Sequence, residues 1–225
     1  MIEGRGLSKR VGGRMLLDGV SLRVGAGEAV AIMGPSGAGK TTLLRCLEGL
    51  ERLDAGTVTV GPDTFGAGAP DYDRAVARVR RRLGFVFQQW HLFPHLTVLE
   101  NVTLAPIHVA ARAPDVAARE AHALLERVGI AARAGARPRE LSGGEQQRAA
   151  IARALALQPE ALLMDEPTSA LDDERVAELV TLLRGLCAEG LALLVVTHDE
   201  PFARALTPRV ITLRGGALSD QSSTR

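Results

Sequence analysis

One octapeptide, Gly34-Pro35-Ser36-Gly37-Ala38-Gly39-Lys40-Thr41, constrains the fold of this chain more than any other feature. It matches the pattern G-x-x-x-x-G-K-[ST], which forms a phosphate-binding loop where it follows a buried strand and opens a helix. The apolar run 29–33 precedes it, and residues 40–50 carry a leucine stripe on one helical face: Leu43, Leu44, Leu47 and Leu50. The alternative is a glycine-rich turn that matches by chance, and the flanking strand and helix argue against it.

The residues of this loop have distinct expected roles. The glycines let backbone N–H groups surround phosphate oxygens, and the helix start adds partial positive charge. Lys40 would hold the β- and γ-phosphates of a nucleotide, and the Thr41 hydroxyl would ligate Mg²⁺. The predicted nucleotide-binding residues here are Gly34, Pro35, Ser36, Gly37, Ala38, Gly39, Lys40, Thr41 and Thr42.

Further compact apolar runs occur at 83–87, 161–164, 191–196 and 210–213. Strands that are buried on both faces have continuous apolar runs of this kind. An amphipathic helix over 173–189 separates two of them, which indicates a parallel sheet with crossover helices. Residues 1–28 and 56–60 predict a small antiparallel sheet. We expect one α/β domain in which 1–93 and 159–225 form the β subdomain and the nucleotide-binding core, and 94–158 form an inserted helical subdomain.

Composition excludes several classes of protein. The net charge is +1, so no basic field indicates a nucleic-acid partner. Cys46 and Cys187 lie far apart and form no metal-spaced pair. The longest apolar run, 191–196, is too short to cross a bilayer, and no signal peptide is apparent. We therefore expect a cytoplasmic protein that reaches the inner face of the cell membrane only through partner subunits.

Two adjacent carboxylates end the apolar run 161–164. Asp165 would reach Mg²⁺ directly or through water, and Glu166 would orient or deprotonate the water that attacks the γ-phosphate. The alternative is a pair of solvated acids that open the turn at 166–168. The preceding phosphate-binding loop favours the catalytic interpretation.

A third motif, Leu-Ser-Gly-Gly-Glu-Gln-Gln-Arg at 141–148, precedes a helix-like segment. Ser142 and Glu145 also form the pattern of a capping box, and a capped helix start with two bare glycines can bind an anion. In this order, the three motifs resemble those of the ABC transporter ATPases. Gln88 resembles the glutamine of that family's Q-loop, Ser169-Ala170-Leu171-Asp172 its D-loop, and His198 its switch histidine.

The resemblance implies a P-loop NTPase core of RecA-like fold that binds ATP and Mg²⁺ and works as a head-to-tail dimer. The dimer would be a homodimer or a heterodimer with a similar ATPase. Each ATP would lie between the phosphate-binding loop of one subunit and the signature of the other, Ser142, Gly143, Gly144 and Glu145. Gln88 would sense Mg²⁺ and the attacking water, Asp172 would link the two sites, and His198 would contact the γ-phosphate. Closure and reopening of the dimer would move transmembrane permease subunits.

The segment 86–107 looks very similar to that of the ATPases that power bacterial importers of polar amino acids, which implies a solute-binding protein in the assembled importer. Clustered aromatic residues, Phe85, Phe87, Trp90 and Phe93, suggest a surface that receives a partner helix, and core packing is the alternative. Lipoprotein-releasing and cell-division ATPases share a related segment. An ABC ATPase without a transport role, acting as a clamp on protein or nucleic acid, is the other alternative. A weaker alternative is a subunit that binds nucleotide without hydrolysing it.

One position departs from the family. The ABC ATPases have an aromatic residue near the chain start that stacks on adenine, and the equivalent position here is Val11. No aromatic residue precedes Phe65. Nucleotide hydrolysis is still expected, but the preference for adenine is in question.

Overall fold

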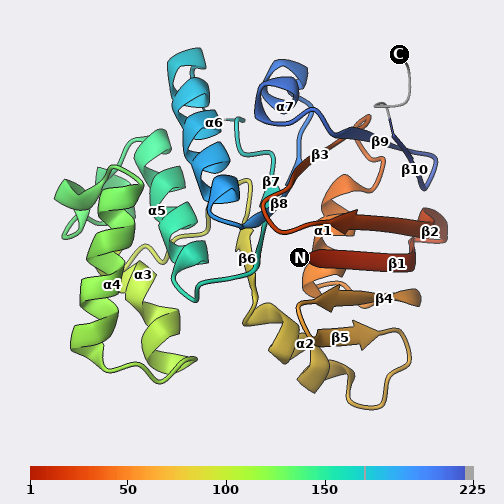
Figure 1. Ribbon diagram of the computed structural model, residues 1–225, viewed down its shortest axis with the longest axis horizontal. Helices are drawn as coiled ribbons and strands as arrows, with labels where there is room; N and C mark the ends of the chain where they lie inside the picture. The colour runs from red at the N-terminus through yellow and green to blue at the C-terminus, as the bar shows by residue number, and fades with distance from the viewer. Residues whose placement is uncertain (170, 221–225) are drawn as a thin grey trace.

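The computed structural model describes residues 1–169 and 171–220, which form two sheets and a set of helices (Figure 1). In chain order the elements are β1 (Ile2–Val11), β2 (Arg14–Val24), β3 (Ala29–Met33), α1 (Lys40–Glu48), β4 (Ala55–Val60), β5 (Asp63–Gly66), α2 (Tyr72–Arg80), β6 (Leu83–Val86), α3 (Val98–His108), α4 (Pro114–Arg127), the 3₁₀ turns η1 (Ala131–Arg133) and η2 (Pro138–Glu140), α5 (Gly143–Leu155), β7 (Ala161–Asp165), α6 (Asp173–Ala188), β8 (Ala192–Val196), α7 (Glu200–Leu206), β9 (Val210–Arg214) and β10 (Ala217–Asp220).

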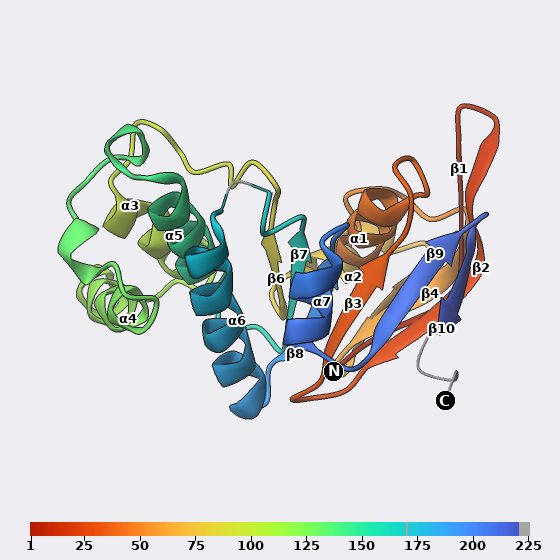
Figure 2. The same cartoon turned by 90° about the horizontal axis from the view of Figure 1, so that it is seen from above.

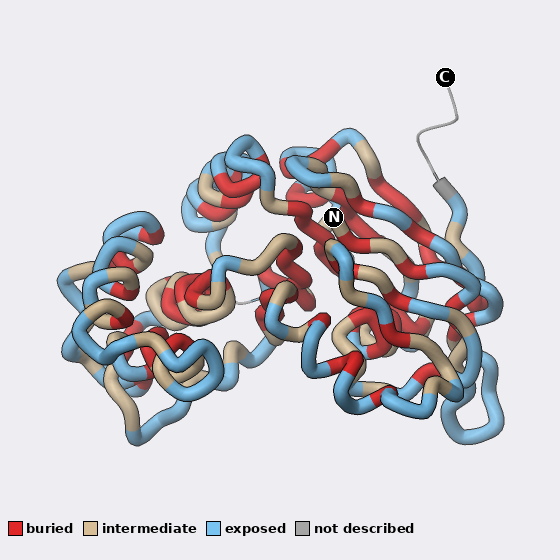
Figure 3. Tube along the Cα trace, turned by 60° about the horizontal axis from the view of Figure 1, so that its bottom comes forward, coloured by how far each residue is buried: buried red, intermediate tan, exposed pale blue. Residues whose placement is uncertain are grey.

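The larger sheet has six strands in the order β10-β9-β3-β8-β7-β6. All neighbouring pairs from β9 to β6 are parallel, and β10 forms an antiparallel hairpin with β9. Successive residues of β7 and β8 enter different cores: Leu163 and Leu194 pack into one, Leu162 and Leu193 into the other. Both faces of these strands are therefore buried, which explains their continuous apolar sequence. Figure 3 shows the buried residues gathered within the molecule.

The second sheet is antiparallel, with the order β2-β1-β4-β5. Its buried residues share a core with α1 and α2. The two sheets meet where Asp18 N–H donates to the Gly216 carbonyl at 2.9 Å, so β2 lies against the β9–β10 hairpin. The predicted α/β fold class, with a mostly parallel sheet and a smaller antiparallel sheet near the N-terminus, is confirmed.

Helices α3, α4 and α5 lie together beside β6, away from the antiparallel sheet (Figures 1 and 2). They occupy much of the 94–158 stretch that the sequence predicted to be helical, and no strand occurs within those residues. Their buried side chains join the core that lies on the α6 face of the large sheet. No helix in the described ranges is long and apolar enough to cross a membrane.

Two details differ from the sequence prediction. Leu50 was expected on the buried stripe of the first helix, but α1 ends at Glu48 and the Leu50 side chain is 47% exposed. Gly49 ends the helix in the left-handed conformation, so the next residue leaves the helical face. The strands β5 and β10 were not predicted, because neither has the continuous apolar run that marks the strands of the large sheet.

Candidate functional site

The phosphate-binding loop joins β3 to α1 in the predicted strand–loop–helix context. Gly39 ends it with φ of 100°, and no side chain caps the first turn of α1. At Gly34 a Cβ atom would lie 2.3 Å from the Leu213 carbonyl oxygen, so no larger residue fits. The first turn of α1 also carries no acidic side chain. Its N–H groups are therefore available to an anion at the positive end of the helix dipole.

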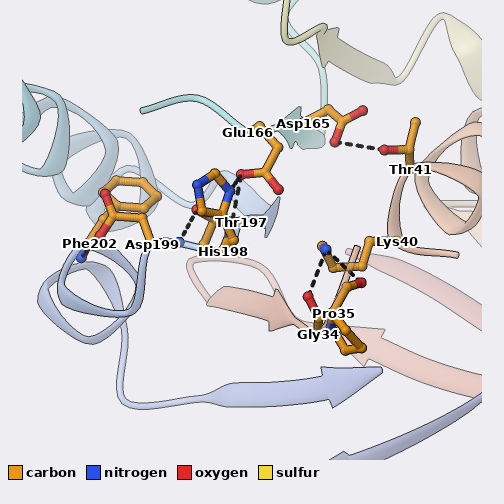
Figure 4. Close-up of polar contacts among 10 residues, drawn as sticks. All are labelled: Gly34, Pro35, Lys40, Thr41, Asp165, Glu166, Thr197, His198, Asp199 and Phe202. Atoms are coloured by element: carbon orange, nitrogen blue, oxygen red, sulfur yellow. Dashed lines mark hydrogen bonds and ion pairs between the residues drawn. The ribbon is translucent and has the colours of Figure 1, made fainter. Parts of the chain in front are cut away.

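Lys40 folds back over this loop (Figure 4). Its Nζ atom donates to the carbonyl oxygens of Gly34 at 2.8 Å and Pro35 at 3.4 Å. The side chain is buried, and within the described residues no carboxylate pairs with it. A buried ammonium group whose partners are neutral carbonyls favours the approach of an anion.

Asp165 ends β7 and faces the start of α1. Thr41 Oγ1 donates to its Oδ1 at 3.2 Å. Burial raises the pKa of the Asp165 carboxyl, and the hydrogen bond from Thr41 partly opposes this effect. The two side chains thus offer a hydroxyl and a carboxylate oxygen at one point, which suits Mg²⁺ held mainly by phosphate and water. No group of three or more His, Cys, Asp or Glu residues that could form a complete protein cage occurs among the described residues.

Glu166 and His198 form the second pair of the site. Glu166 Oε2 accepts from the His198 backbone N–H at 3.2 Å and lies 2.8 Å from His198 Nδ1. The Glu166 side chain is 13% exposed, whereas that of His198 is 71% exposed. Glu166 has φ of 47°, a left-handed conformation that is unfavourable for a residue with a side chain. Its N–H is held by the Val196 carbonyl at 2.9 Å, so the sheet fixes this conformation.

The polar residues on either side of His198, Thr197 and Asp199, were not predicted, and their hydrogen bonds hold the backbone that carries this histidine. Thr197 Oγ1 accepts from the Asp199 N–H at 3.0 Å. Asp199 in turn caps α7 by accepting from the Phe202 N–H at 2.9 Å (Figure 4). The sequence carried a signal for this, because Asp before Glu-Pro is a typical helix start.

The strand order brings these groups to one edge of the sheet. Strands β3, β8, β7 and β6 are neighbours in that order, and their carboxyl ends lead into the phosphate-binding loop, His198, Asp165–Glu166 and Gln88. Gln88 lies in an exposed turn directly after β6, and its side chain makes no hydrogen bond to any described residue. Ligands of open parallel sheets bind at this carboxyl edge.

The signature residues lie elsewhere in the same chain. Ser142 caps α5 by accepting from the Glu145 N–H at 3.3 Å, and the Glu145 carboxylate accepts from the Ser142 N–H at 2.8 Å, so the predicted capping box is present. The cap leaves Gly143 and Gly144 at the helix start. Strands β6 and β7 lie between helix α5 and helix α1 (Figure 2). One chain therefore does not bring its signature to its own phosphate-binding loop.

Of the remaining predicted residues, Val11 and Asp172 lie in different surroundings. Val11 lies at the tip of the β1–β2 hairpin, is 47% exposed and pairs with Arg14. Asp172 caps α6 by accepting from the Arg175 N–H at 2.9 Å. Ala170, in the D-loop-like segment, lies outside the described residues.

The aromatic cluster at 85–93 is split between core and surface. Phe85 belongs to the core, and its ring centroid lies 4.3 Å from that of the half-buried Phe87. Trp90 packs partly against the helical core, whereas Phe93 is exposed. For Phe85 the alternative of core packing is therefore correct.

Comparisons with known proteins point to one family. The family model described as ABC transporter matches residues 17–169. The octopine permease ATP-binding protein P of Rhizobium meliloti is 48% identical over 96% of this chain and 85% of its own. The L-cystine transport system ATP-binding protein of Escherichia coli is 45% identical over 100% and 90% of the two chains. The glutamine transport ATP-binding protein of Bacillus subtilis is 42% identical over 99% and 90%.

Solved structures agree with these relatives. A dimeric, post-hydrolysis form of the ATP-binding cassette MJ0796, bound to ADP and Pi, matches with a TM-score of 0.86 and 35% identity over 100% of both chains. A second dimeric structure of that cassette matches with a TM-score of 0.84 and 38% identity over 97% of each chain. Motif order, fold and relatives all lead to the same conclusion: the chain belongs to the ABC transporter family.

Proposed function

We propose that this chain is the ATP-hydrolysing subunit of an ABC importer of polar amino acids and that it binds ATP together with Mg²⁺. The observation that carries the proposal is the meeting of two pairs, Thr41 with Asp165 and Glu166 with His198, at the sheet edge that carries the phosphate-binding loop. The relatives named for octopine, cystine and glutamine transport support the class of solute.

The residues have distinct roles in hydrolysis. Lys40 and the free N–H groups at the start of α1 hold the β- and γ-phosphates. Thr41 and Asp165 are the residues that would hold Mg²⁺, which neutralises charge on the phosphates when bound. Glu166 accepts a proton from the attacking water as its oxygen bonds to the γ-phosphorus. The bond from that phosphorus to the bridging oxygen then breaks, leaving ADP and phosphate.

His198 holds the Glu166 carboxylate in place. Because both contacts use Oε2, the other carboxylate oxygen is left to face the water. In this proposal the exposed imidazole would also contact the γ-phosphate from the β8 side of the site. Gln88, at the end of the neighbouring strand β6, would complete the surroundings of the water and the metal.

The site needs a second subunit. Ser142 to Glu145 lie away from the phosphate-binding loop of their own chain, and the solved cassettes that this chain matches are dimeric. In the proposed dimer the start of α5 in one subunit closes over the nucleotide of the other, and Asp172 lies between the two sites. Permease subunits and a solute-binding protein complete the importer at the inner face of the cell membrane.

Two measurements test this function. The purified subunit is expected to hydrolyse ATP only with Mg²⁺, and Lys40→Ala is expected to abolish both ATP binding and hydrolysis. The tagged chain, expressed in its own host and recovered from solubilised membranes, is expected to retain integral membrane subunits that restore amino acid uptake in vesicles. Absence of ATP hydrolysis, or attached subunits that export lipoprotein or carry no solute, would overturn the proposal.

A further inference from the structure

The tip of the β1–β2 hairpin carries a guanidinium group that has no partner. Arg14 is exposed, and its side chain makes no hydrogen bond or ion pair with any residue of the described ranges. The nearby Arg10 differs, because its Nη1 donates to the Gly13 carbonyl at 2.9 Å and its backbone N–H donates to Asp54 Oδ2 at 2.6 Å. Arg10 is thus held by the hairpin, whereas the Arg14 side chain is available to bind a ligand.

Arg14 lies on the hairpin face that touches the phosphate-binding loop. A Cβ atom on Gly39 would lie 3.0 Å from the Leu16 carbonyl oxygen and 3.3 Å from the Leu16 Cβ, so the Leu16 side chain is directed toward the loop. Leu16 is the extra residue of a bulge in β2, because Lys9 pairs with Leu17 and Arg10 with Met15. Lys9 and Val11 share one face of β1, so Arg14, the partner of Val11, lies on the face of Leu17, which is buried in the core shared with α1. Val11 is paired directly with Arg14, so the two side chains are neighbours on that face.

The hairpin also lies on the side of the phosphate-binding loop that the base of a bound nucleotide would face. Asp165 ends β7 and Glu166 follows it, and β7 lies with β8 on one side of β3. The hairpin lies on the other side, where Asp18 is bonded to Gly216 next to β9 and β10. Figure 2 shows β7 and the hairpin on opposite sides of α1. A nucleotide whose terminal phosphate faces Glu166 therefore directs its ribose and base toward Val11 and Arg14.

The chemistry of this tip suits a planar aromatic ligand. Val11 is exposed and apolar but has no π-face. A guanidinium group is flat and stacks on aromatic faces, including bases, with an added cation–π attraction. Because Arg14 has no carboxylate partner in the described part of the chain, stacking on a base breaks no existing ion pair.

We propose that Arg14 is a specificity-determining residue that stacks on the nucleotide base, with Val11 as its apolar neighbour. The inference rests on the proposed function, since it assumes that the phosphates occupy the loop at 34–41. It assigns base binding to the second strand of the hairpin instead of the first.

The test compares ATP with inorganic triphosphate, which has the same phosphate groups and no base. Arg14→Ala is expected to raise the Kd and KM for ATP about 3- to 10-fold at unchanged kcat, the range expected for an exposed stacking contact. Its affinity for triphosphate is expected to stay at the wild-type value. Arg14→Lys keeps the charge and removes the flat π-surface, so it should lose most of the ATP affinity that Arg14→Ala loses.

Arg74→Ala is the matched control, because Arg74 is an exposed arginine on α2 whose side chain has no partner among the described residues. It removes the same charge and should change neither affinity. Equal losses of ATP and triphosphate affinity in Arg14→Ala would mean a phosphate contact and would overturn the inference. Unchanged ATP affinity of Arg14→Ala, where the wild-type subunit binds ATP, would also overturn the inference. If the wild-type subunit bound no ATP at all, the proposed function itself would fail.

Discussion

Substitution of Glu166 by Gln isolates the step of water activation. The two His198 contacts both use Oε2. A glutamine amide oxygen can occupy the same position and accept from the same two N–H groups, so the geometry of the pair is kept. Only the ability to accept a proton is lost. Because Gln has the same shape, the left-handed backbone at residue 166 needs no further adjustment.

The substitution should have a small effect on stability and a large effect on kcat. His198 is largely exposed, so its contact with Glu166 is screened by solvent and is worth at most about 1 kcal/mol of folding free energy. The melting temperature of Glu166→Gln is therefore expected to stay close to that of the wild type. Loss of a general base lowers kcat by about 10²- to 10⁴-fold, which corresponds to roughly 3 to 5 kcal/mol in the barrier.

Steady-state phosphate release gives kcat, and equilibrium ATP binding gives the affinity, on the same preparation of the variant. Size-exclusion chromatography with ATP and Mg²⁺ should show a dimer that accumulates in the variant, because closure occurs and hydrolysis does not follow. Glu126→Gln, an exposed position on α4, is the control and should behave as the wild type. Near-wild-type turnover by Glu166→Gln would refute the role of Glu166. Loss of ATP binding would show that the residue acts on the nucleotide and not on the water.

Three further substitutions address the parts of the proposal that depend on other contacts. Ser142→Arg should abolish hydrolysis while the monomer keeps its affinity for ATP, measured by titration calorimetry; weaker ATP binding by the monomer would contradict a site completed by the partner subunit. Val11→Tyr should lower the KM for ATP about 3- to 30-fold with little change in kcat and raise the ATP/GTP preference, because stacking acts equally on ground and transition states. Unchanged constants for both nucleotides would place the base away from Val11. Trp90→Ala should leave the subunit folded and hydrolysing but weaken its retention on permease-containing membranes by about 2 kcal/mol or more, and unfolding of this variant would show that Trp90 serves core packing alone.

Much of the local structure follows from sequence alone. The glycines of the loop, the leucines of α1 and the apolar runs of the central strands each act over a few residues, so spacing reveals them. The capping box at Ser142 is read in the same way. The strands β5 and β10 were missed, because Asp-Thr-Phe-Gly and Ala-Leu-Ser-Asp contain no continuous apolar run, and each forms a strand only through its hairpin with β4 or β9.

The arrangement of the site was decided by tertiary structure. The pairs Thr41–Asp165 and Glu166–His198 join residues 124 and 32 positions apart, and Leu16 of the β1–β2 hairpin approaches Gly39 of the phosphate-binding loop. These contacts depend on the strand order β9-β3-β8-β7-β6. Strands buried on both faces have nearly the same apolar sequence, so their pattern identifies them as strands but does not specify their neighbours. The order is set by the packing of helices on both faces of the sheet, which is a property of the whole chain.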